Sequence, residues 1–186
     1  GDHVVYGQVV VPGAFYVAVL LSIAATRWPD EAIELTDVQF IEALWFDSAH
    51  ERVTMHIHLQ VEEGDRMQAT MAAHRDGIWT THATAVMGIA TETLDLQFPI
   101  DDRHAVQKVD TERMLGMLSE MSIDWGPRWV WFDGMGETES LKFGRFALPQ
   151  DVSLDAPIAG GLLDNSFSIP FIQADAPEGD RVPRLP

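Results

Sequence analysis

The chain has 186 residues, of which 46% are hydrophobic and 22% are charged, an ordinary globular composition for one domain or two small halves. Its net charge is −17, from 12 Lys and Arg against 29 Asp and Glu, so neither a nucleic acid nor an anionic membrane is an expected partner. Cysteine is absent, which excludes disulfides and thiolate chemistry, and no signal peptide or membrane span is evident. We therefore expect a cytoplasmic protein.

The first predicted element is a helix over the apolar run 14–25, AFYVAVLLSIAA. The run is too short to cross a bilayer, which needs about 20 apolar residues. A helix that is apolar on nearly every side is typical of the centre of a soluble domain. We therefore predict that Val17, Leu20 and Leu21 are largely buried.

The start of this helix is predicted to be a chemical site. Pro12 and Gly13 stand where the helix begins, and backbone N–H groups at a helix start lack partners and carry a partial positive charge. Such N–H groups can hold a developing oxyanion. His3 lies upstream on the strand-like segment 3–6, which can bring its imidazole close to the helix start. A base beside an oxyanion site is what removal of a proton next to a carbonyl requires.

Four strand-like runs follow, at 34–46, 52–62, 67–75 and 78–89. Apolar and polar residues alternate in the second run with the period of a half-buried strand, and a turn signal precedes the fourth. A buried helix followed by an antiparallel meander is therefore expected. His56 and His58 lie on the second run without an evident third ligand, so we predict an exposed strand face there rather than a metal site.

The second part of the chain begins with a polar stretch, 91–107, which predicts a linker between two halves. A helix is predicted over 111–121, capped by Asp110 or Thr111. A hairpin is predicted over 130–148 with its turn at 134–137, and a second buried helix starts in 161–169.

Two patterns with fixed spacing occur in order along the chain. The pattern H-x-x-x-G-x-x-x-x-P is matched by His3, Gly7 and Pro12. The pattern G-Y-x-Y-G-P-x-F is matched in part by 122–129, where Gly126 and Pro127 are identical. In that segment Trp125 and Trp129 replace a tyrosine and the phenylalanine. Both patterns resemble motifs of the dehydratase domains of modular polyketide synthases.

The third motif of the family, D-x-x-x-Q or D-x-x-x-H, is matched by Asp164, with Ser168 in the last position. A carboxyl buried among Leu162, Leu163 and Phe167 would have a raised pKa, which suits a general acid. The chain thus resembles a polyketide synthase dehydratase domain along its length.

This resemblance implies an α+β fold, the double hotdog, in which two long central helices are each wrapped by a curved antiparallel sheet. It assigns residues 1–90 to the first half with His3, 91–107 to the linker and 108–186 to a partial second half with Asp164. The family has further strands before His3 and after the second helix, so the fold is expected to be incomplete at both ends.

The resemblance also implies a function, the dehydration of a β-hydroxyacyl thioester on an acyl carrier protein to the α,β-unsaturated thioester. His3 would be the general base and Asp164 the general acid. The residues that would bind the substrate are Gly7, Pro12, Gly13, Trp125, Gly126, Pro127 and Ser168. Neither a metal nor a cofactor of its own is implied, because the substrate arrives on phosphopantetheine. The implied partners are the carrier protein, other domains of the same synthase and a second copy in a homodimer.

Several alternatives remain open from the residues alone. Asp164 can be a helix cap, and 125–129 can be a Gly-Pro turn with core tryptophans. A related enzyme could shift a double bond or form a pyran ring by oxa-Michael addition, and a non-catalytic module could serve dimer contacts or docking. Trp125 offers an indole N–H but no phenol, and Ser168 replaces a longer side chain.

Overall fold

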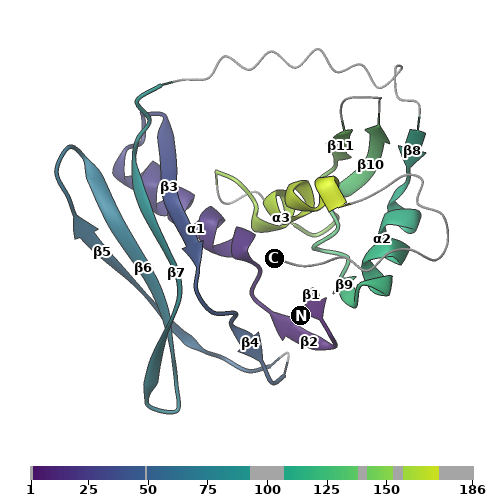
Figure 1. The fold of residues 1–186 in the computed structure, drawn as a ribbon, viewed down its shortest axis with the longest axis horizontal. Coiled ribbons are helices and arrows are strands. Elements are labelled where there is room, and N and C mark those ends of the chain that lie inside the picture. Colours follow the sequence, from purple (N-terminus) through teal and green to yellow (C-terminus); the bar gives the residue numbers. More distant parts are fainter. Residues whose placement is uncertain (1, 49, 93–106, 138–141, 153–156, 172–186) are drawn as a thin grey trace.

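The computed structural model describes residues 2–48, 50–92, 107–137, 142–152 and 157–171. Within these ranges, three sheets and three α-helices form two layered halves that lie side by side in Figure 1, with α1 and α3 between the sheets. The elements in chain order are β1 (His3–Val5), β2 (Gln8–Val10), α1 (Gly13–Arg27), β3 (Ile33–Phe40), β4 (Trp45–Phe46), β5 (Thr54–Val61), β6 (Arg66–Arg75), β7 (Ile78–Ile89), β8 (Gln107–Val109), α2 (Thr111–Glu120), β9 (Ile123–Trp125), β10 (Phe132–Glu137), β11 (Lys142–Phe146), α3 (Gly160–Ser168) and the 3₁₀ turn η2 (Ile169–Phe171).

A small sheet of order β4-β2-β1-β9 pairs three strands from the start of the chain with β9. Tyr6 and Gly7 form the two-residue turn between β1 and β2, and their φ angles of 51° and 76° suit the right-handed twist of an antiparallel hairpin. Strand β9 pairs with β1 on the other side, so that His3 lies opposite Trp125. A strand from the predicted second half therefore fixes the strand that carries His3.

The larger sheet, of order β3-β7-β6-β5, packs against α1. Tyr16 and Leu20 of the helix contact sheet residues that are small or flexible, namely Ala69, Met71, Ala83 and Ala85. Small side chains let a helix lie close to a sheet. Register shifts in β3 and β7 interrupt the ladders, and such irregularities bend a sheet around what it covers.

Helix α1 begins and ends as expected but is less enclosed than predicted. Leu20 is 1% exposed, whereas Val17 and Leu21 are only half-buried and Phe15 is exposed. The predicted burial is therefore confirmed fully for Leu20, whereas Val17 and Leu21 are buried only in part. The sheet covers one side of the helix, and a groove of about 800 Å³ runs along another side past Phe15 and Ile23.

The second half has its own apolar core between α2 and the sheet of order β11-β10-β8. Met114 and Leu118 form the buried face of α2. The backbone N–H of Arg113 donates to Oδ1 of Asp110 at 2.8 Å, so Asp110 is the N-cap.

The turn predicted at 134–137 was wrong, because those residues lie inside β10. Two glycines in a strand can mark a close approach of neighbouring groups as well as a turn. A Cβ at Gly134 would lie 3.1 Å from the guanidinium of Arg145, which shows such an approach. The connection between β10 and β11, and most of the predicted linker, lie outside the described residues; Gln107 already belongs to β8.

The described strands otherwise agree with the four predicted runs after α1, although the first of them is divided into β3 and β4. His56 and His58 lie on the exposed face of β5, as predicted. None of the described helices combines the length and apolar character needed to cross a membrane.

Candidate active site

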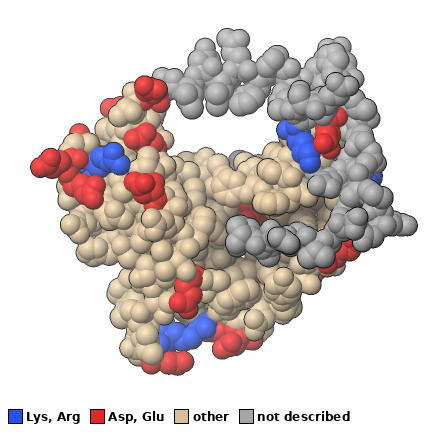
Figure 2. Space-filling view, in the orientation of Figure 1, with Lys and Arg blue, Asp and Glu red and all other residues tan. Residues whose placement is uncertain are grey.

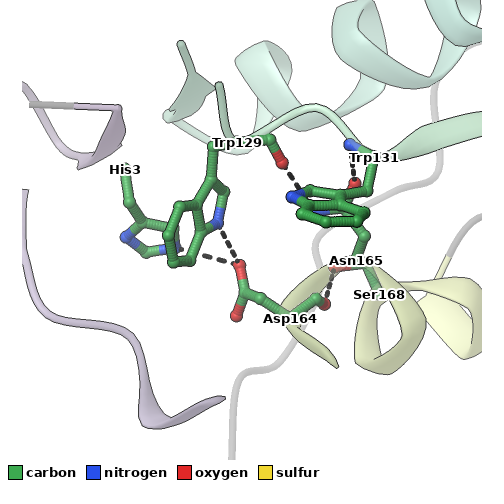
Figure 3. Close-up of polar contacts among 6 residues, drawn as sticks. All are labelled: His3, Trp129, Trp131, Asp164, Asn165 and Ser168. Atoms are coloured by element: carbon green, nitrogen blue, oxygen red, sulfur yellow. Dashed lines mark hydrogen bonds and ion pairs between the residues drawn. The ribbon is translucent and has the colours of Figure 1, made fainter. Parts of the chain in front are cut away.

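His3 and Asp164 lie side by side although 160 residues separate them in the sequence of 186. Nε2 of His3 is 3.5 Å from Oδ2 of Asp164, and the two side chains are 14% and 17% exposed. His3 comes from β1 and Asp164 from the second turn of α3 (Figure 3). Ala159 is the N-cap of that helix, so the alternative that Asp164 is the cap was wrong.

Burial acts on both groups in the direction that favours their neutral forms. Desolvation lowers the pKa of His3, against smaller raising effects of the Asp164 charge and of the Val10 backbone. Desolvation raises the pKa of Asp164, against smaller lowering effects of a hydrogen bond from Trp129 and of the His3 charge. A neutral imidazole can accept a proton and a protonated carboxyl can donate one, so the pair can work as a base and an acid.

Two neighbours of Asp164 were not predicted as site residues. The indole Nε1–H of Trp129 donates to Oδ2 of Asp164 at 2.9 Å, and the Trp129 ring meets the His3 ring edge to face at 5.9 Å between centroids. Asn165, which is 0% exposed, accepts hydrogen bonds from the backbone N–H groups of Trp131 and Phe132 and donates to the carbonyl of Trp129. An amide next to the motif aspartate in an apolar segment was the signal that could have pointed to Asn165.

The segment 125–129 positions the chain on both sides of the pair. The N–H of Gly126 donates to the carbonyl of Asp2 at 2.8 Å, and Arg128 forms an ion pair with the Asp2 carboxylate. A Cβ at Gly126 would overlap the side chain of Asp2, which is a physical reason for glycine there. Trp125 lies opposite His3 in the ladder, but its Nε1 is buried without a hydrogen-bond partner among the described residues.

The start of α1 lies across a pocket from Asp164. A pocket of about 360 Å³ has Gly13 and Ala14 of the helix start on one side and Asp164 and Phe167 of α3 on the other. Pro12 precedes the helix without a side-chain cap, so no side chain of Pro12 competes for the first N–H groups. The pocket thus combines a helix start with the carboxyl of Asp164, whereas His3 is not one of the residues that line it.

Three more ionisable side chains line this pocket, those of Tyr16, Glu42 and His82, and none of them was singled out from the sequence. Nδ1 of His82 lies 2.8 Å from the carbonyl oxygen of Glu42, and its ring stacks parallel to Tyr16. Burial raises the pKa of Tyr16 to about 12, so its phenol stays protonated near neutral pH. The mouth of the pocket carries the exposed apolar rings of Phe40 and Phe167.

The remaining predicted binding residues are spread around the pair. Gly7 lies in the exposed β1–β2 turn, and Pro127 is exposed beside the Gly126 contact. Ser168 donates its hydroxyl to the backbone carbonyl of Asp164 at 3.1 Å, one turn earlier in α3. These three residues therefore lie near the elements that carry His3 and Asp164 but do not line the pocket. Their binding roles stay predictions.

No group of three or more His, Asp or Glu side chains in the described parts of the chain is arranged to hold a metal ion. The described site offers an imidazole, a carboxyl, an indole N–H and a helix start.

The comparisons with known proteins agree with this fold. Residues 1–74 match the family model described as polyketide synthase dehydratase domain. No curated protein matches the chain in sequence.

Solved structures match the described fold closely. The dehydratase domain from the CurF module of curacin polyketide synthase has a TM-score of 0.79 at 20% identity, over 90% of this chain and 63% of that domain. The CurJ dehydratase domain has a TM-score of 0.77 at 23% identity, over 96% of this chain and 63% of that one. The CurK dehydratase matches with a TM-score of 0.78 as two variants described as inactive, one with an aspartate changed to asparagine (19% identity) and one with a histidine changed to phenylalanine (18% identity), each over 90% of this chain and 61% of theirs.

The first 74 residues thus match the polyketide synthase dehydratase family in sequence, and the chain has the α+β double hotdog fold of these domains. The resemblance predicted from the three motifs is confirmed. The chain spans less than two thirds of the length of the first two of these domains, at 63% of each. The predicted division at 91–107 stays a prediction.

Proposed function

We propose that the protein dehydrates a β-hydroxyacyl thioester carried by an acyl carrier protein, and forms the α,β-unsaturated thioester during polyketide biosynthesis. The observation that carries this proposal is the 3.5 Å approach of the His3 imidazole to the Asp164 carboxyl beside the start of α1. The inactive histidine and aspartate variants of the CurK dehydratase support the assignment of one residue of each type to the chemistry.

In the proposed reaction, Nε2 of His3 takes the α-proton of the substrate while the C–H electron pair forms the new double bond. The bond between the β-carbon and its hydroxyl oxygen breaks, and Asp164 gives a proton to that oxygen, so one water leaves. The backbone N–H groups of Gly13 and the start of α1 polarise the thioester carbonyl, because negative charge accumulates on the carbonyl oxygen as the α-proton departs. Both side chains return to their starting states when Asp164 regains a proton and His3 loses one.

The neutral forms that burial favours suit these roles. His3 must be unprotonated to act as a base, and burial lowers its pKa. Asp164 must be protonated to act as an acid, and burial raises its pKa. Activity should therefore fall below the pKa of His3 and above that of Asp164, which gives a bell-shaped pH profile.

The partners belong to the same proposal. The substrate arrives on the phosphopantetheine arm of the carrier protein, and no cofactor of the enzyme's own takes part. We also propose that the enzyme is cytoplasmic, contacts other domains of the same synthase and works as a homodimer, which sedimentation of the purified protein would test.

A second candidate, a double-bond isomerase, is favoured by one observation. The hydrogen bond from Trp129 to Oδ2 of Asp164 stabilises the charged carboxylate, which has no proton to donate. An enzyme that only shifts a double bond needs a base at the acidified carbon but no acid for a departing hydroxyl.

One experiment separates the two reactions. A β-hydroxyacyl carrier protein is incubated in deuterated solvent with the wild-type protein or with Asp164→Asn, and the acyl chain is analysed by mass spectrometry. We expect the wild-type protein to remove one water, and Asp164→Asn to lose elimination while still exchanging the α-proton through His3. Full elimination by Asp164→Asn would contradict the role of Asp164. Isomerisation of an unsaturated substrate without any elimination by the wild-type protein would favour the second candidate.

A further inference from the structure

Asn165 attaches helix α3 to the segment that precedes β10. Its Oδ1 accepts the N–H groups of Trp131 at 2.9 Å and Phe132 at 3.0 Å, and its Nδ2 donates to the carbonyl of Trp129 at 3.0 Å. The side chain is completely buried, so no water competes for these bonds. All three partners belong to one short segment, 129–132, so this amide fixes the segment to α3.

The backbone of Trp129 is fixed by hydrogen bonds, and its indole ring contacts Asp164. Its N–H donates to the carbonyl of Gly126 at 2.9 Å, and its carbonyl accepts from Asn165. Its indole then reaches back to α3 and donates to Oδ2 of Asp164 at 2.9 Å (Figure 3). Consecutive residues on a helix point about 100° apart, so Asp164 and Asn165 contact the same tryptophan from two directions.

The two oxygens of the Asp164 carboxyl are therefore not equivalent. Oδ2 accepts the indole N–H and lies near Nε2 of His3. The other oxygen points away from both rings in Figure 3 and makes no hydrogen bond within the described parts of the chain.

We propose that Trp129 and Asn165 are positioning residues for Asp164: Asn165 holds the backbone of Trp129, and Trp129 holds Oδ2, so that Oδ1 is the oxygen presented to the substrate hydroxyl. This assignment rests on the dehydratase function proposed above. It gives a role to a tryptophan at a position where the family motif has phenylalanine, which fills similar space but has no N–H to donate.

Several charged and titratable groups surround Asp164 in addition to Trp129. His3 faces Asp164 from β1, while Tyr16 of α1, His82 of β7 and Glu42 line the same pocket. Of the effects on the pKa of Asp164, burial is the largest and raises it, and the Trp129 hydrogen bond lowers it. Loss of the indole N–H should therefore move this pKa further upward.

The experiment titrates the carboxyl directly in the full-length protein without substrate. The Cγ signal of Asp164, assigned by its loss in Asp164→Asn, is followed by NMR as the pH changes. We expect Trp129→Phe to raise the midpoint, and Trp131→Phe to leave it at the wild-type value. Trp131 is a matched control because it lies in the same segment, has the same ring, and makes no hydrogen bond to Asp164 among the described residues. An unchanged midpoint in Trp129→Phe overturns the proposal.

The role of Asn165 is tested through its dependence on Trp129. Asn165→Ser should raise the midpoint in the wild-type background but should add nothing in Trp129→Phe, because Asn165 acts through that indole. If the midpoint shifts of Asn165→Ser and Trp129→Phe add up in the double variant, Asn165 does not act through Trp129 and its proposed role is overturned. If Asn165→Ser loses its fold, the Trp129→Phe midpoint alone decides.

The same variants separate this proposal from the proposed function. In the dehydration assay, Trp129→Phe should lower turnover and move the alkaline limb of the pH profile upward, in parallel with the NMR midpoint. A raised midpoint in a protein that never removes water would contradict the dehydratase function and keep the positioning role. If the wild-type protein dehydrates its substrate, but Trp129→Phe changes neither the NMR midpoint of Asp164 nor the alkaline limb of the pH profile, the dehydratase function stands and the positioning role is contradicted.

Discussion

Helices α1 and α3 occupy comparable places in the two halves, but different forces hold them. Helix α1 has 15 residues and packs on its sheet through apolar contacts, such as Leu20 against Ala69 and Met71. Helix α3 has 9 residues and is attached through the buried amide of Asn165. Apolar packing tolerates small shifts in position, whereas hydrogen bonds depend on direction as well as distance. The carboxyl of Asp164 is therefore on a helix that is fixed by directed hydrogen bonds and also packs against α1.

Figure 2 shows a related contrast on the surface. Asp and Glu side chains gather over the first half and along the lower margin, while the centre of this face carries few charges. The acidic side chains of the described residues are thus unevenly distributed over this face.

The largest expected effect comes from removing the base. His3→Ala should reduce dehydration by roughly two to four orders of magnitude, because His3 is the proposed proton acceptor. The fold should survive, since β1 keeps its pairing with β2 and β9 through the backbone. Turnover is measured by mass spectrometry, and circular dichroism reports the fold. Near-normal turnover by a folded His3→Ala protein would remove His3 from the mechanism.

The packing of α1 is tested by overfilling it. Ala69 is 0% exposed and contacts the cluster around Leu20, so Ala69→Leu should lower the free energy of unfolding by about 1–3 kcal/mol. Ala32→Leu adds the same atoms at an exposed position and should change stability little. Denaturant unfolding measures both. Equal stability of the two variants would show that the contact between α1 and its sheet is loose.

The attachment of α3 is tested at its two glycines. A Cβ at Gly161 would lie 2.6 Å from the indole nitrogen of Trp131, which is 5% exposed and cannot swing outward. Gly161→Ala should therefore shift α3 and reduce turnover. A Cβ at Gly160 would meet its nearest atom at 3.5 Å, an ordinary contact, so Gly160→Ala should stabilise the helix by up to about 1 kcal/mol.

Thermal unfolding and turnover of these two glycine variants give the comparison. If both behave alike, the close contact between α3 and Trp131 does not determine where Asp164 lies.

The smallest effect is a pH-dependent change in stability. Because the pKa of Asp164 is higher in the folded protein than in the unfolded chain, the unfolded chain loses the proton first as pH rises. The contribution of Asp164 to the free energy of unfolding is fully present below the pKa that this carboxyl has in the unfolded chain. It is lost as the pH rises through the pKa that the carboxyl has in the folded protein. Asp164→Asn lacks this titration. The unfolding temperature of this variant, relative to that of the wild-type protein, should therefore increase as the pH rises from about 4 to neutral.

A parallel offset between the two melting curves at every pH would contradict the raised pKa of Asp164. His3 has the opposite sign: its pKa is lowered by folding, so its contribution is present above 6.5 and is lost on acidification through the folded pKa. Measurements on His3→Ala therefore provide the control for the direction of the effect.

The sequence by itself determined the local elements and the identity of the pair. The apolar run of α1, the alternation in β5 and the spacing around α2 each depend on neighbours a few residues apart, so they can be read without a fold. The three motifs placed His3 and Asp164 in one family before any distance was known.

Tertiary structure decided what those residues touch. Trp129 and Asn165 acquire their roles from partners on another element, and the glycines at 134 and 136 continue a strand because both pair with β11. The partial burial of Val17 likewise depends on which side of α1 the sheet covers. A pattern along the chain states which side chains are apolar or polar, but a hydrogen bond across 36 residues exists only when folding brings its donor and acceptor together.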